Sequence, residues 1–147
     1  MDRRSFLKGA FSAGALAATG GCRMFTGAKG DFDENLTGFV SDVHVKPDGY
    51  QLERFRQVVA EILRMDPLPR NVVCFGDIAY LQGRVQDYRC SYGELKLLVD
   101  AGIKLTLGLG NHDHRKAFLE VWPEYEQRTV VPGFVHSVTS LPDFALI

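Results

Sequence analysis

Three apolar segments of the chain each end in a cluster of polar residues. The segments LTGFVSDVHV, NVVCFGD and IKLTLGLGN have the length and composition of buried strands. The polar side chains at their ends are carboxylates, imidazoles and one amide: Asp42, His44, Asp77, Asn111, His112 and Asp113. Such groups at the tips of strands that need burial constrain the fold, because they have to face a site or solvent rather than a core.

Helical segments separate these strands. The apolar residues of YQLERFRQVVAEILRMD recur at helical spacing, and Pro67 and Pro69 end this helix. YGELKLLVDAG predicts a short helix closed by Gly102, and RKAFLEVWPEY predicts a helix broken at Pro123. Two further strands are expected in FVHSVTSL and DFALI. Alternating strands and helices are typical of an α/β fold with a parallel sheet.

The carboxyl ends of parallel strands meet at one edge of a sheet, where ligands bind. Asp42 and His44 are two residues apart, so in an extended chain both point to the same side and can bind one metal ion. Gly76 and Gly110 precede the other two clusters and allow a sharp exit from each strand. Each feature alone also fits ordinary turn chemistry. Their coincidence at three successive strand ends predicts a metal site.

The order and spacing of Asp42-x-His44, Gly76-Asp77 and the run from Gly110 to Asp113 resemble the first three motifs of the calcineurin-like metallophosphoesterases. The resemblance covers residues 37 to 147. It implies a four-layer α/β/β/α sandwich that holds two divalent or trivalent metal ions at the strand ends. Mixed nitrogen and oxygen ligands suit Mn, Fe or Zn, and the sequence does not choose among them.

The resemblance also implies a role for each residue of the site. The expected metal ligands are Asp42, His44, Asp77 and Asn111. Asp77 would bridge the two ions, and His112 would contact the scissile phosphate and protonate the leaving oxygen. Asp113 would orient His112 and fix its tautomer. The implied reaction is hydrolysis of phosphate mono- or diesters by a metal-bridged hydroxide that attacks in line.

Other charged residues have weaker patterns. Residues 78–91 read as a loop beside the predicted site, in which Arg84 or Arg89 could hold a phosphate, although solvated side chains explain both arginines more simply. His114 fits the start of a helix, and His136 fits a structural position in a strand. The net charge of −1 gives no electrostatic indication of nucleic-acid binding.

The chain begins MDRRSFLKGAFSAGALAATGGC, which closely resembles a twin-arginine export signal. Its apolar stretch is too short and too weak to span a bilayer. We therefore expect a signal peptide over residues 1–28, a tether over 29–36, and a protein that is periplasmic or anchored to the cell envelope. Two ends of the signal compete: cleavage before Cys22, which would carry a lipid, and cleavage near Ala28.

The resembled family uses further histidine motifs later in its chain. This sequence has four histidines, and its last segment, DFALI, reads as a strand that is cut in the middle. We therefore expect residues 37–147 to be the N-terminal part of a longer domain, with weak metal binding on its own. The alternative is a catalytically inactive envelope lipoprotein that keeps a remnant of the fold.

Overall fold

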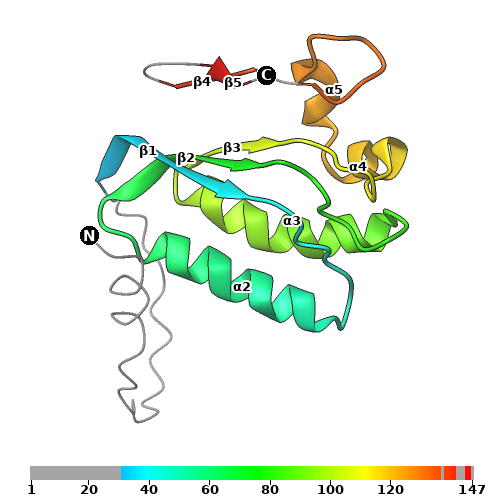
Figure 1. Cartoon of the computed structure of the whole chain (residues 1–147), viewed down its shortest axis with the longest axis horizontal. Helices are drawn as coiled ribbons and strands as arrows, with labels where there is room; N and C mark the ends of the chain where they lie inside the picture. Colours follow the sequence, from blue (N-terminus) through cyan, green and yellow to red (C-terminus); the bar gives the residue numbers. More distant parts are fainter. Residues whose placement is uncertain (1–30, 137, 142–144, 147) are drawn as a thin grey trace, which may run out of the picture.

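The computed structural model describes residues 31–136, 138–141 and 145–146 (Figure 1). Its elements in chain order are β1 (Phe32–Val40), α2 (Tyr50–Leu63), β2 (Leu68–Cys74), α3 (Val85–Asp100), β3 (Lys104–Leu107), α4 (Arg115–Val121), α5 (Glu124–Arg128), β4 (Thr139–Ser140) and β5 (Ala145–Leu146). The expected signal peptide and Cys22 lie outside the described residues. None of the helices within these ranges is long and apolar enough to cross a bilayer.

The central sheet has three parallel strands in the order β1-β2-β3. Helices α2 and α3 lie side by side on one face of this sheet, and the small antiparallel pair β4–β5 lies on the other side (Figure 1). The predicted α/β class with a parallel sheet is confirmed. The described elements thus form a helix layer, a parallel sheet and a second small sheet, in the order that the first three layers of an α/β/β/α sandwich require.

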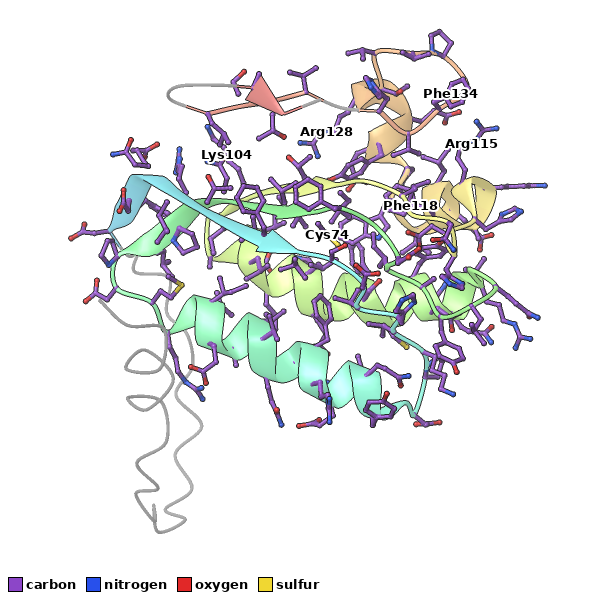
Figure 2. All side chains as sticks on the ribbon, viewed as in Figure 1. Cys74, Lys104, Arg115, Phe118, Arg128 and Phe134 are labelled. Atoms are coloured by element: carbon purple, nitrogen blue, oxygen red, sulfur yellow. The ribbon has the colours of Figure 1, made fainter. Side chains whose placement is uncertain are left out.

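The core lies between the central sheet and the two long helices. Helix α2 buries Leu52, Phe55 and Val59, which recur at helical spacing on one side. The middle strand β2 buries Val72 and Cys74 completely (Figure 2), as a strand covered on both faces should. Burial raises the pKa of the Cys74 thiol to about 11, so this cysteine is an unreactive core residue.

An aromatic cluster packs α4 against α3. Phe118 is fully buried (Figure 2), and its ring centroid lies 5.7 Å from that of Tyr88 and 5.4 Å from that of Tyr125, both in edge-to-face geometry. Trp122 packs against Tyr92 of α3 at 4.6 Å between ring centroids. Such pairs contribute about 0.5–1.5 kcal/mol each beyond the area they bury. The short helix α4 is therefore held by packing, because at seven residues it is too short to be stable alone.

The expected tether over residues 29–36 is wrong for residues 32–36, which form the first half of β1. Phe32 pairs in register with Leu68 of β2, and the Arg70 guanidinium lies 5.1 Å from the centre of the Phe32 ring. These partners are more than 30 residues away along the chain, so the polar composition of the segment concealed them. Tertiary pairing overrides weak strand propensity here.

Other boundaries also differ from the sequence-based expectation, and β2, for example, runs Leu68–Cys74 rather than over residues 71–77. Residues 78–91 are not a loop throughout, because α3 begins at Val85. Asp87 caps this helix: its carboxylate accepts a hydrogen bond from the Arg84 backbone N–H at 3.2 Å. The expected strand over residues 134–141 is reduced to Thr139–Ser140, and His136 lies outside it.

Candidate metal centre

The loops that follow β1 and β2 run alongside each other beyond the ends of the strands. The backbone N–H of Asp42 donates to the carbonyl of Gly76 at 3.2 Å, and the N–H of His44 donates to the carbonyl of Asp77 at 2.9 Å. These hydrogen bonds continue the parallel pairing of the two strands into their polar ends. Two of the three predicted clusters are therefore held together by the backbone itself.

Three of the predicted ligands have a strained backbone. Asp42, His44 and Asp77 have φ values of 56°, 45° and 50°, which place them in the left-handed region that residues other than glycine rarely adopt. Such a conformation costs about 1–3 kcal/mol per residue and persists only where the surrounding structure enforces it. The bends turn the three side chains toward one another, and strain of this kind is typical of functional sites.

The side chains of these three residues converge. One ligand atom from each of Asp42, His44 and Asp77 lies within 4.8 Å of the other two. The Nε2 atom of His44 is 3.9 Å from Oδ1 of Asp42, which is too far for a direct hydrogen bond and leaves space between them. Two carboxylates and an imidazole suit a transition-metal ion or zinc. The residues present therefore fit the metal that the sequence predicts.

The third loop, after β3, approaches these two closely because glycine occupies both contact positions. A Cβ atom at Gly76, which has a φ of 120°, would clash with the backbone of Gly110. A Cβ atom at Gly110 would clash with the carboxylate and backbone N of Asp77. Only glycine fits at these two positions, so the sharp exits expected from the sequence also set how tightly the three loops pack.

His112 lies beside the convergent group. Its backbone N–H donates to Oδ1 of Asp77 at 2.8 Å, and its ring lies 5.0 Å from the His44 ring in edge-to-face geometry. Its Nδ1 is 3.1 Å from the carbonyl oxygen of Leu81. Because a carbonyl can only accept, Nδ1 carries the proton in this contact. Nε2 is then the ring nitrogen that remains for chemistry.

Asp113 differs from its expected role, since the Leu81 carbonyl and not Asp113 contacts the His112 ring. The carboxylate of Asp113 accepts hydrogen bonds from the backbone N–H groups of Ile78 at 3.1 Å, Ala79 at 3.0 Å and Gly110 at 2.9 Å. It thereby joins the second loop to the third. His112 is the neighbour of Asp113 in the loop that the hydrogen bond from Gly110 holds.

Asn111 is exposed and lies between two residues that touch Asp77. The N–H of His112 on one side binds the Asp77 carboxylate, and Gly110 on the other side packs against it. The two neighbours of Asn111 therefore lie against the carboxylate that the resemblance assigns as a bridge, and metal binding by Asn111 itself stays a prediction. His114 is the N-cap of α4, as its position in the sequence predicts.

Arg84 and Arg89 do not reach the site. The Arg84 guanidinium donates to Oε1 of Gln82 at 2.7 Å, and Arg89 pairs with Glu120 at 3.3 Å. The hollow that opens beside His44 and His112, about 570 Å³ in volume, is lined by neither arginine. Arg84 is the N-cap of α3 and Arg89 lies in its second turn, and both residues are exposed.

Tyr88 is a site residue that sequence reasoning missed. It is fully buried, its hydroxyl donates to Oδ1 of Asp113 at 3.0 Å, and it accepts the backbone N–H of His114 at 2.7 Å. Burial raises its pKa well above the ordinary range, so the hydroxyl remains a donor. The only signal in the sequence was an aromatic residue in a polar segment, which did not distinguish it from its neighbours.

We expect Tyr88→Phe to weaken Mn²⁺ binding by about tenfold, because Tyr88 holds the Asp113 carboxylate that joins the two loops carrying Asp77 and Asn111. The matched control is Tyr125→Phe. Tyr125 is also buried, and its hydroxyl binds the backbone at Leu107 and Leu105, away from the site. Equilibrium dialysis with metal analysis measures both variants. An equal loss of affinity in the two variants, or no loss in either, would contradict the assigned role of Tyr88.

One protein family matches the part of the chain that contains the site. The family model for calcineurin-like phosphoesterases matches residues 37–146, which is more than half of the chain. Among curated proteins, no similar sequence was found. The matched range begins in β1 and contains all six predicted site residues. The chain therefore belongs to the calcineurin-like phosphoesterase family, whose members are metal-dependent hydrolases of phosphoesters.

Proposed function

We propose that this protein is an exported phosphoesterase that hydrolyses phosphate mono- or diesters with two metal ions. The observation that carries the proposal is the convergence of Asp42, His44 and Asp77, whose ligand atoms lie within 4.8 Å of one another on strained backbone. Membership of a metal-dependent phosphoesterase family supports the reaction class. The mixed oxygen and nitrogen donors suit Mn, Fe or Zn.

Each residue of the site has a place in this reaction. Asp42 and His44 would hold one ion, Asn111 the other, and Asp77 both. When bound, the ions supply an activated water as nucleophile and positive charge for the phosphoryl oxygens. The carboxylate of Asp77 already accepts the His112 N–H, which fixes the spacing between the ligands and the His112 ring.

His112 is the proposed proton donor to the leaving oxygen. The hydrogen bond from Nδ1 to the Leu81 carbonyl remains in the neutral and the protonated ring, because Nδ1 carries a hydrogen in both forms. Nε2 therefore gains and loses the proton without a ring flip. The 5.0 Å separation of the His112 and His44 rings supports this role, because His44 is one of the proposed metal ligands.

Asp77→Asn should lower hydrolysis of 4-nitrophenyl phosphate and bis(4-nitrophenyl) phosphate by about 100-fold or more in Mn²⁺, because the amide cannot bridge two cations. The control is Asp100→Asn, which removes a carboxylate that pairs with Lys96 on the surface of α3. Steady-state rates on the purified full chain measure both. Activity of Asp77→Asn within twofold of the parent would contradict the proposal and favour an inactive remnant of the fold.

Export is proposed from the N-terminal sequence, MDRRSFLKG. Replacing Arg3 and Arg4 by lysine should retain the protein in the cytoplasm, because the twin-arginine signal depends on the arginines and not on their charge alone. Lys8→Arg, which also keeps the charge, should be exported as the parent is. Cell fractionation measures all three, and full export of the double variant would overturn the route.

The mass of the exported protein distinguishes the two proposed ends of the signal. A chain that begins at Cys22 with added lipid mass supports an envelope anchor, and a chain that begins after Ala28 supports a free periplasmic protein.

A further inference from the structure

The hollow beside the metal centre has one wall that the proposed reaction does not use. Tyr50, Arg54 and Val58 of α2 line it, at a spacing of four residues that places them on one ridge of the helix. Asp42, His44 and His112 line the same hollow. A group bound at these residues would therefore share the hollow with Arg54.

Arg54 places a positive charge in this wall, and no acidic side chain of the described residues pairs with it. Its guanidinium carbon lies 5.2 Å from the centre of the Tyr50 ring. Arg56, two residues later, faces away from the hollow and donates to Glu94 of α3 at 2.8 Å. Stacking on Tyr50 limits the motion of the Arg54 side chain while leaving its N–H groups for a ligand.

The rest of the hollow is mixed: Ser41, Asp42 and Gln51 are polar, and the other side chains are apolar or aromatic. Val40, Val43, Phe55 and Val58 line it together with the rings of Tyr50 and Tyr80. Lys46 lies 4.3 Å from the centre of the Tyr80 ring, which adds positive potential behind this wall. A surface of this kind favours a flat apolar group, and the guanidinium at its end favours a negative charge.

We propose that this hollow binds the organic group of the substrate, and that Arg54 binds a second anionic group on it. The substrate class is then a phosphate ester of a flat, apolar group that carries a further carboxylate or phosphate. This inference rests on the proposed function, because it takes the scissile phosphate to lie at Asp42, His44 and Asp77. Arg54 sets specificity and takes no part in the reaction.

The test compares two probes on the full chain loaded with Mn²⁺, phenyl phosphate and 4-carboxyphenyl phosphate, and the affinity for each is taken from the KM of its hydrolysis. We expect the carboxylated probe to bind the parent about fivefold more tightly, as one exposed charge-assisted contact allows. Arg54→Gln should abolish this advantage and leave the affinity for phenyl phosphate unchanged. Arg56→Gln, which removes the same charge from the same helix, should keep the advantage.

The outcomes separate this inference from the function on which it rests. If phenyl phosphate is hydrolysed but the carboxylate gives no advantage, or if Arg56→Gln removes the advantage equally, the Arg54 subsite is wrong and the metal centre stands. If the parent hydrolyses neither probe, the proposed function fails and the subsite fails with it. Arg54 is exposed, so its replacement leaves the core intact, and circular dichroism checks this.

Discussion

The carboxylate of Asp113 is the contact on which the geometry of the site depends. It accepts backbone N–H groups from the loop after β2 and the loop after β3, and it accepts the hydroxyl of Tyr88 from α3. Hydrogen bonds to a carboxylate contribute about 1.5–3 kcal/mol each, more than neutral ones. This is the same order as the cost of the left-handed conformations of Asp42, His44 and Asp77. The hydrogen bonds of Asp113 therefore help to offset the conformational cost of the strained backbone at the site.

Packing in the core transmits this constraint to the rest of the fold. Tyr88 contacts Asp113 with its hydroxyl and Phe118 with its ring, so the same side chain joins the polar site to the aromatic cluster. The two glycines, Gly76 and Gly110, let the loops approach to backbone contact. Polar loops that would be mobile on an ordinary surface are thereby fixed to a close-packed interior.

Much of this arrangement could be predicted from the sequence, because its strongest signals are local. The periodicity of α2 and the apolar run of β2 depend on neighbouring residues, and both elements are present, although β2 begins at Leu68 rather than Asn71. That the three polar strand ends lie at one edge of the sheet follows from parallel pairing, whereas the convergence of Asp42, His44 and Asp77 also depends on their left-handed backbone conformation. The start of β1 could not be predicted, because Phe32 is held by Leu68 and Arg70 across the sheet. The partner of His112 could not be predicted either. It is the backbone carbonyl of Leu81, and every residue has such a group, so the sequence does not single it out.

The central claim is that Asp42, His44, Asp77 and Asn111 hold two metal ions. The most direct test is a crystal structure of the full chain grown with Mn²⁺, with anomalous diffraction to locate the metal. We expect one peak among Asp42, His44 and Asp77, and a second about 3.5–4 Å away that contacts Asp77 and Asn111. Manganese bound elsewhere, or no peak within coordination distance of the Asp77 carboxylate, would contradict the account.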